Sequence, residues 1–322
     1  LTVNLHLLMV TFYRPKPTKY KIICEAKAFP SDQYAIESQV RTNGFDPKDA
    51  IIEISPREGE STIRHSDIIK AIEDAGDSLA LVLFGGVNFF TGQVFDMMEI
   101  TEAAHKVNAY AGFDLAHAAG NIQMELHGWQ VDFACWCSYK YLNSGPGGVA
   151  GAFIHEKHAK NPDLPRFAGW WGYDKAKRFK MEKGFEPILS AEGWQLSNAP
   201  ILSMAAHKAS IDMFEEVGMD SLVEKSERLT SYLGFVIEDI NTLITDGRNL
   251  EVITPKSLKW RGCQLSVVAH GRGKDLFYSL LDAGVITDWR EPNVIRMAPV
   301  PLYNSFEDIF LFGQILKKLI IH

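Results

Sequence analysis

Two residues with reactive side chains, Asp114 and Lys140, each lie close to the end of a buried apolar strand in this sequence. Asp114 closes the apolar run 109–114 and is followed by His117, and Lys140 follows the run 131–137. Ligands of open α/β sheets bind outside the carboxyl ends of the strands, so both side chains are expected at a ligand site. A Lys desolvated by apolar neighbours has a lowered pKa and can form a Schiff base. An acid that keeps a pyridine nitrogen protonated and a Lys that holds an aldehyde are what pyridoxal phosphate requires.

The same two residues also have an ordinary structural interpretation. Asp114 could cap the N-terminus of a helix and Lys140 could be a surface residue, and their spacing alone leaves this open. Other familiar chemistry finds less support. The sequence has no G-x-x-x-x-G-K-[ST] motif, no G-x-G-x-x-G that opens a helix and no G-x-S-x-G. Pyridoxal phosphate therefore stays the leading interpretation.

Two short clusters of potential metal ligands are interpreted as structural. Segment 155–158 reads His-Glu-Lys-His, one residue short of the H-E-x-x-H motif, and is expected to be a solvated helical turn. Cys135 and Cys137 alternate within an apolar strand and are expected to be buried free thiols. No metal site is predicted.

The elements that must position Asp114 and Lys140 form a repeating pattern of strands and helices. Short, almost continuously apolar runs are typical of strands buried on both faces, and helical patterns lie between them. Strands separated by helices indicate βαβ units, hence a mostly parallel central sheet with helices on both faces. The connection between the last two strands is too short for a helical crossover, so that pair is expected to be antiparallel. The predicted strands are 21–26, 79–84, 109–114, 131–137 and 149–154, and the predicted helices are 67–75 and 97–107.

The second half of the chain has a different organisation. Residues 161–199 are rich in Pro, Gly and Trp and are expected to form long surface loops with aromatic anchors. A long helical stretch over 200–240, interrupted near Gly218, leads into a compact α+β unit, and Ser305 opens a capping box that starts a C-terminal helix. We predict an α/β large domain over 1–199 and a long helix with a smaller α+β domain over 200–322.

Composition excludes several classes of function. Among 322 residues, 33 Lys and Arg against 40 Asp and Glu give a net charge of −7, which argues against nucleic-acid binding. Four Cys are too few for a disulfide framework, which favours a reducing, cytoplasmic compartment. No uncharged apolar run approaches 18 residues, so no membrane span is predicted. Residue 1 is Leu, within sequence that already looks structured, and we expect a missing upstream part.

Several long motifs, in order along the whole chain, resemble kynureninases, which are fold-type-I pyridoxal phosphate enzymes, and the similarity is close to the animal-type enzymes. The resemblance implies that an N-terminal segment found in that family, with some substrate contacts, is absent here. The matching segments are Leu1-Thr2-Val3-Asn4-Leu5-His6, Glu25-Ala26-Lys27-Ala28-Phe29-Pro30-Ser31-Asp32, Gly112-Phe113-Asp114-Leu115-Ala116-His117, Cys135-Trp136-Cys137-Ser138-Tyr139-Lys140-Tyr141-Leu142-Asn143 and Arg296-Met297-Ala298-Pro299-Val300-Pro301-Leu302-Tyr303-Asn304.

The resemblance implies a role at the cofactor ring for five residues. Lys140 would bond covalently to the cofactor aldehyde, and Asp114 would pair with the pyridinium nitrogen, assisted by His117. Asp32 would lie close by, and Phe29 would stack on the ring. Phe29 could instead be plain core, and His117 could be a structural histidine.

Further positions would hold the cofactor phosphate. The Leu1-Thr2 backbone and the Thr2 hydroxyl would bind it at a helix N-terminus. Tyr139 would contact the phosphate and is the family's candidate for proton transfer. Gly85 stands where the animal enzymes carry Ser, which leaves only a backbone contact. The other implied cofactor contacts near this end are Pro30 and Ser31.

Substrate recognition is implied for residues far apart in the chain. Arg296 would clamp the substrate α-carboxylate with a bidentate fork, although it could also make a structural ion pair. Ser197 and Asn198 match positions associated with a 3-hydroxy substrate, and Asn198 would also complete the cofactor site. Trp170 would reach the cofactor from the partner subunit of a homodimer, or else simply anchor its own loop.

The function that the resemblance implies is hydrolysis of kynurenine or, preferentially, 3-hydroxykynurenine to an anthranilate and L-alanine. This reaction belongs to tryptophan catabolism and the route to NAD. Two alternatives remain: a non-catalytic scaffold that keeps the dimer but not turnover, and a related aminotransferase or cysteine desulfurase. A desulfurase needs an exposed nucleophilic Cys, whereas Cys24, Cys135 and Cys137 lie in buried-looking strands and Cys263 opens another.

Overall fold

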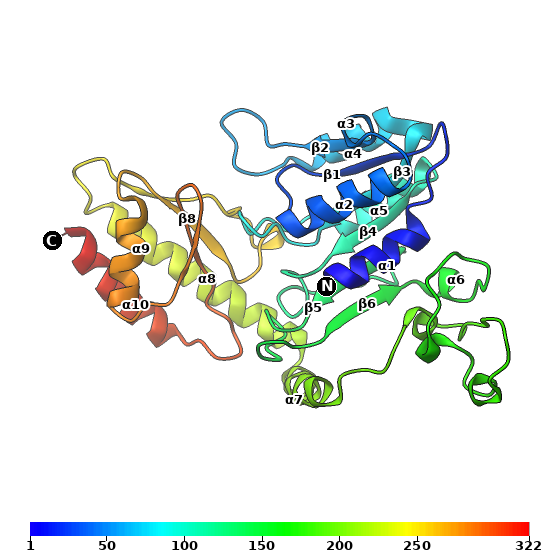
Figure 1. The fold of residues 1–322 in the computed structure, drawn as a ribbon. Coiled ribbons are helices and arrows are strands. Elements are labelled where there is room, and N and C mark those ends of the chain that lie inside the picture. Colours follow the sequence, from blue (N-terminus) through cyan, green and yellow to red (C-terminus); the bar gives the residue numbers. More distant parts are fainter. Residues whose placement is uncertain (322) are drawn as a thin grey trace.

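The computed structural model describes residues 1–321 and contains two sheets (Figure 1). The larger sheet has six strands in the order β2-β1-β3-β4-β5-β6. Its first five strands pair in parallel, and β5 and β6 pair antiparallel as predicted from their short connection. The strands are β1 (Lys21–Glu25), β2 (Ile51–Ile54), β3 (Leu79–Gly85), β4 (Tyr110–Asp114), β5 (Phe133–Cys137) and β6 (Ala150–Ile154).

Helices cover both faces of this sheet (Figure 1). One buried cluster joins α4 and α5 to one face through Ile68, Ile72 and Ile100, and a second joins α1 and α2 to the other face through Leu5 and Ile36. Burial on both faces explains why the inner strands are almost continuously apolar. The helices are α1 (Thr2–Phe12), α2 (Pro30–Thr42), α3 (Pro47–Ala50), α4 (His65–Ala75), α5 (Met97–Lys106) and α6 (Glu156–Ala159), with a 3₁₀ turn at Gly76–Ser78.

The smaller sheet has four strands in the order β7-β8-β10-β9, and every pair in it is antiparallel. Its core is shared with helices α8, α9 and α10. The capping box at Ser305 is confirmed: its hydroxyl accepts from the Asp308 N–H, and its own N–H donates to the Asp308 carboxylate. The elements are α7 (Ile201–Val217), α8 (Met219–Asn241), β7 (Leu250–Val252), β8 (Leu265–Ala269), α9 (Gly273–Asp282), β9 (Asp288–Arg290), β10 (Val294–Met297) and α10 (Phe306–Ile321), with a 3₁₀ turn at Leu258–Trp260.

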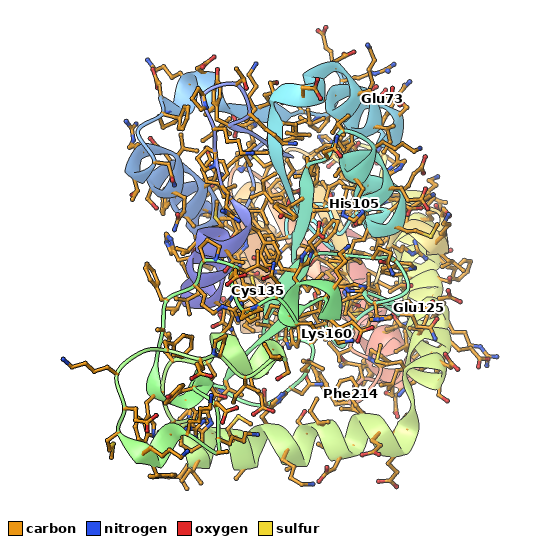
Figure 2. The ribbon with its side chains drawn as sticks, turned by 90° about the vertical axis from the view of Figure 1, so that its right-hand side faces the viewer. Glu73, His105, Glu125, Cys135, Lys160 and Phe214 are labelled. Carbon is orange, nitrogen blue, oxygen red and sulfur yellow. The ribbon has the colours of Figure 1, made fainter. Side chains whose placement is uncertain are left out.

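Segment 161–199 forms loops with 3₁₀ turns at Trp170–Gly172, Arg178–Lys180 and Ala191–Trp194. One predicted aromatic anchor is clear: Trp194 is buried and its indole N–H donates to the Thr11 hydroxyl of α1 at 2.9 Å. The segment leads into α7, which runs along the lower edge of the molecule with Phe214 on its inner side (Figure 2). Among the helices of residues 1–321, none is long and apolar enough to cross a membrane.

The helical turn predicted at 155–158 is present as α6, but only part of it is solvated: Glu156 and Lys157 are exposed. His155 is buried, and Asp132 accepts a hydrogen bond from Nε2 of His158 at 2.6 Å. Asp132 lies just before β5, at the opposite end of the sheet from Lys140, and is also hydrogen-bonded by His105 at 2.8 Å and by the Ala111 N–H at 2.8 Å. A buried acid needs such partners, and it recruits the two His side chains from α5 and α6.

Replacing Asp132 with Asn is expected to lower the free energy of unfolding by about 3 kcal/mol. The buried donors that now bond to its carboxylate would lose the negative charge that they share. Burial alone would raise the pKa of Asp132, but hydrogen bonds from His105, His158 and the Ala111 N–H outweigh it and hold the pKa well below its usual range. A depressed folded-state pKa stabilises the fold above the unfolded-state pKa, and this contribution is lost as the pH falls. Because the loss falls below the unfolded-state pKa of about 3.9, urea unfolding at pH 7 and at pH 2 measures both effects.

The matched control for this prediction is Asp74→Asn, which changes an exposed carboxylate paired with Lys70. Exposed helical pairs contribute little, so the control is expected to match wild type. Equal unfolding curves for Asp132→Asn and wild type would contradict the structural role of this cluster.

Candidate active site

The carboxyl ends of β1, β3, β4 and β5 meet at one edge of the larger sheet and surround a pocket. This is where parallel α/β sheets place their ligands. The structure brings most of the predicted cofactor-binding residues together here. Those that line the pocket are Leu1, Thr2, Phe29, Ser31, Asp32, Gly85, Asp114, His117, Tyr139 and Lys140.

Two carboxyl groups, Asp32 and Asp114, are buried side by side in this pocket. Burial, and then the charge and hydrogen bond of Asp114, raise the pKa of Asp32 to about 9. Burial also raises the pKa of Asp114, but hydrogen bonds from Asp32 and from the Ala116 N–H, and the charge of Lys140, act in the opposite direction. Like charges in one apolar site cannot both ionise easily. Asp32 therefore holds a proton at neutral pH, and Asp114 is the acceptor of the pair.

The Lys140 side chain extends over the Phe29 ring. Its Nζ lies 5.6 Å from the centroid of the Phe29 ring, within the range of a cation–π contact. Phe29 is 42% exposed, and its ring and the Phe89 ring meet edge to face with centroids 5.4 Å apart. This arrangement places an amine beside a surface on which an aromatic ring can stack.

Two helix N-termini border the pocket. Helix α1 begins at Thr2 and α2 begins at Pro30, and the Thr2 and Ser31 hydroxyls are hydrogen-bonded at 2.6 Å. Free backbone N–H groups and the helix dipole favour an anion at such a place. Tyr139 is 50% exposed beside them, and burial followed by its contact with Cys137 raises its pKa.

Gly85 is held by a residue that the sequence analysis did not single out as functional. Its backbone N–H donates to Oε1 of Glu25 at 3.3 Å. A Cβ added at Gly85 would lie 2.8 Å from the same oxygen, closer than real contacts allow. Glu25 ends β1 and lines the pocket. An acid at the end of a buried strand was the signal that identified Asp114, and the same signal could have identified Glu25.

His117 is half-buried and packs against the Tyr141 ring, with centroids 5.7 Å apart. Burial, and then the charges of Lys140 and Arg296, hold the pKa of His117 well below its usual value, so the imidazole is neutral. Its Nδ1 finds no hydrogen-bond partner among residues 1–321. An unpaired buried nitrogen is costly and marks a place where a ligand can bond.

Arg296, on β10 of the smaller sheet, approaches the site from the other domain. Its Nη1 donates to the Phe89 carbonyl at 2.6 Å, and its Nη2 pairs with Asp288. Its Nε has no partner in the described part of the chain. The alternative interpretation of Arg296 as a member of a structural ion pair is therefore supported by its contact with Asp288. Its Nε–H donor is still unused.

Besides Arg296, four predicted site residues do not line this pocket in the single chain. Ser197 and Asn198 line a different pocket, between α1 and β6. Trp170 is 41% exposed and contacts Phe179, with ring centroids 5.6 Å apart. Pro30 is the first residue of α2 and does not itself line the pocket.

The residues of the pocket fit pyridoxal phosphate in their chemistry. The fit rests on the unpaired buried oxygen Oδ1 of Asp32 and Nδ1 of His117. It also rests on the amine above the Phe29 face and on the paired hydroxyls at two helix N-termini. An aldehyde, a pyridine ring and a phosphate each find complementary groups.

The fold and the facing Asp114 and Lys140 define a class of protein. Residues 46–262 match the model of the aminotransferase class-V family. The apo structure of a cysteine desulfurase from Thermococcus onnurineus NA1 covers the same architecture with a TM-score of 0.79 at 18% identity, over 99% of this chain and 77% of that one. This protein therefore has the fold-type-I, class-V aminotransferase fold.

Within that class, the chain belongs to the kynureninase family. Residues 222–316 match the kynureninase C-terminal domain model. Kynureninase of Flavobacterium psychrophilum is 61% identical over 321 residues, which are 100% of this chain and 75% of that protein. Kynureninase of Mus musculus is 47% identical over 323 residues, or 99% and 69%. The predicted resemblance is confirmed, with higher identity to this bacterial relative than to the mouse enzyme.

Proposed function

We propose that this protein uses pyridoxal phosphate to hydrolyse L-kynurenine or 3-hydroxy-L-kynurenine to an anthranilate and L-alanine. Family membership supports the reaction, as does the observation that carries the proposal: Lys140 and Asp114 face one pocket at adjacent strand ends. The bound cofactor supplies an electron sink for breaking a carbon–carbon bond. Water is the second reactant, and the bond between Cβ and Cγ is the one that breaks.

The residues of this chain orient the reactants and move protons. Lys140 would hold the cofactor covalently through Nζ, and the same amine, when free, would move the α-proton. Asp114 would keep a proton on the ring nitrogen, supported by its hydrogen bond from Asp32. Phe29 would stack on the ring, and neutral His117 would offer its unpaired Nδ1 to a ring substituent. These roles match the charges and exposures of the five side chains.

The remaining contacts fix the two charged ends of the bound molecules. The N-terminus of α1 at Leu1-Thr2, with the hydroxyls of Thr2 and Ser31, holds the phosphate. Tyr139 lies beside that end and can exchange a proton with the substrate. Arg296 binds the α-carboxylate, for which a guanidinium fork is suited and a Lys is not.

We further propose a homodimer with shared active sites. Helix α7 exposes a row of large apolar side chains, of which Ile201 and Leu202 are 81% and 87% exposed. Such a row on a free surface is costly and is typical of an interface. A second copy of the chain covering it can bring its own Trp170, and the Ser197-Asn198 pair, to the pocket around Lys140.

Mixing two inactive variants tests the shared site. Lys140→Ala and Trp170→Ala, each refolded alone, are expected to turn over poorly, but refolding them together creates mixed dimers with one intact site. Random pairing restores activity to about one quarter of wild type. The measurement is anthranilate release after co-refolding, with sedimentation to establish the dimer. Activity no greater than the sum of the two separate variants would contradict a shared site.

The sparse, buried cysteines support a reducing compartment, and we propose the cytoplasm and a place in tryptophan catabolism leading toward NAD. The function itself is tested by supplying the purified chain with pyridoxal phosphate and kynurenine and following anthranilate by fluorescence. We expect turnover on both substrates and preference for 3-hydroxykynurenine. Sulfide release from cysteine without anthranilate would instead favour a desulfurase, and cofactor binding without any turnover would favour a scaffold.

A further inference from the structure

Glu25 is a buried acid that lines the pocket, and both of its carboxylate oxygens accept hydrogen bonds. Oε2 accepts from Nδ2 of Asn88 at 2.6 Å, and Oε1 accepts from the Gly85 N–H at 3.3 Å. Glu25 and Asn88 are each less than a tenth exposed. A buried carboxylate without a cationic partner is costly, and burial raises the pKa of Glu25 to about 7 although the hydrogen bonds from Asn88 and Gly85 lower it.

Asn88 is the organising residue of the loop that connects β3 to α5. Its Oδ1 accepts from the backbone N–H groups of Phe90 and Thr91 at 3.0 and 2.8 Å, and from the Thr91 hydroxyl at 3.0 Å. Its backbone bonds across the loop to Gly92 and Gln93. Because Oδ1 is committed to these donors, Nδ2 must face Glu25, and the side chain at position 25 must be an acceptor there.

The loop fixed by Asn88 is where the large domain contacts the substrate-binding side of the small domain. The Phe89 carbonyl accepts from Nη1 of Arg296 at 2.6 Å and from Nε2 of Gln264 at 3.2 Å. The next carbonyl, of Phe90, accepts from the Ser266 hydroxyl at 2.6 Å. The position of the Phe89 carbonyl therefore sets one of the two hydrogen bonds that orient the Arg296 guanidinium.

We infer that Glu25 is a positioning residue for the substrate carboxylate: through Asn88 and the Phe89 carbonyl it holds the Arg296 guanidinium beside the pocket, which Phe89 lines. The inference rests on the proposed function for the identity of the carboxylate that Arg296 binds. Glu25 itself touches neither that carboxylate nor Arg296. Its effect is transmitted in three steps. Asn88 donates to Glu25, the backbone N–H groups of Phe90 and Thr91 donate to Asn88, and Arg296 donates to the Phe89 carbonyl in the same loop.

The direction of the Glu25–Asn88 hydrogen bond provides a sharp test. Glu25→Gln keeps the size of the side chain but sets an amide donor against either the Asn88 amide or the Gly85 N–H. Asn88→Asp instead sets two carboxylates against each other. The double variant Glu25→Gln with Asn88→Asp reverses the bond, because Gln can donate to Asp while its carbonyl accepts from Gly85. It also restores the total charge.

The readout compares two ligands of the loaded enzyme that differ only in a carboxylate, L-alanine and ethylamine. Their dissociation constants come from the change in the visible absorption of the cofactor, without turnover. Each single variant is expected to weaken alanine about tenfold and ethylamine little, since a misaimed guanidinium loses its carboxylate contact. KM for kynurenine should rise by a similar factor with a smaller change in kcat. The double variant should return within about threefold of wild type.

Asp132→Asn controls for lost stability, because it removes a buried acid far from the pocket and should leave the alanine-to-ethylamine ratio unchanged. A single variant with the wild-type ratio, or a double variant no better than the singles, would overturn the inference. A failure of the proposed function is seen separately, as wild-type protein that releases no anthranilate. The ligand ratio is measured without that reaction.

Discussion

Changing Lys140 to Ala is expected to abolish both the visible absorption of bound pyridoxal phosphate and the release of anthranilate. Lys140 is the lysine that lines the pocket, and its Nζ lies above the Phe29 ring beside the buried Asp114. Without this amine the cofactor loses its covalent attachment and the site loses its closest base. We expect kcat to fall on the order of 10⁴-fold, as for other residues that form a covalent bond during turnover. Absorption titration with the cofactor and a product assay measure the two effects.

Lys70→Ala is the matched control, since it removes an exposed lysine on α4 that pairs with Asp74. It should bind the cofactor and turn over as wild type does. A Lys140→Ala protein that keeps the visible band and more than about a tenth of wild-type kcat would show that another group holds the cofactor.

Changing Asp114 to Asn is expected to have the second largest effect. An amide has nearly the shape of the carboxylate and can still accept from the Ala116 N–H, which donates to Asp114 at 2.6 Å. It cannot, however, stabilise a positive charge on the cofactor ring, and the ring is the electron sink of the reaction. We expect kcat to fall about 10³-fold with the cofactor still bound. Steady-state kinetics and the absorption spectrum at several pH values measure this.

Asp32→Asn is the informative comparison, because Asp32 already holds a proton at neutral pH. The pKa of Asp32 is raised to about 9, chiefly by burial. Asn resembles a protonated carboxyl group, so this variant should lose less than about tenfold in kcat. If Asp32→Asn proved as damaging as Asp114→Asn, the two carboxyl groups would have exchanged roles.

The sequence predicted the parts of the site that depend on local pattern. Apolar runs that end in Asp114 or lead to Lys140 placed both residues at one sheet edge, and the structure confirms that they line one pocket. The same pattern predicted the antiparallel end of the sheet, where only a short connection separates β5 from β6. The strands are apolar because they are buried on both faces, and the antiparallel pairing follows from the short connection between β5 and β6. Both the apolar runs and the length of the connection can be read in the sequence.

Other parts depend on contacts between distant residues and were missed or remain predictions. The Glu25–Asn88 bond joins residues 63 positions apart, and the Arg296–Phe89 bond joins residues 207 apart. Strand β2 was not predicted: it has three half-buried Ile side chains and the exposed Glu53, which interrupts the apolar run that marked its neighbours. The roles of Trp170 and Asn198 stay predictions. So does the domain boundary after residue 199, because Ser210 of α7 donates to the Leu142 carbonyl of the large domain.

The central claim, that pyridoxal phosphate is held by Lys140, is tested most directly by fixing the attachment in place. Loading the protein with the cofactor, reducing it with sodium borohydride, and mapping the peptides by mass spectrometry identifies the modified residue. We predict a single phosphopyridoxyl group on Lys140, in the peptide that follows β5. A group on another lysine, or an unmodified Lys140 after full loading, would contradict the account.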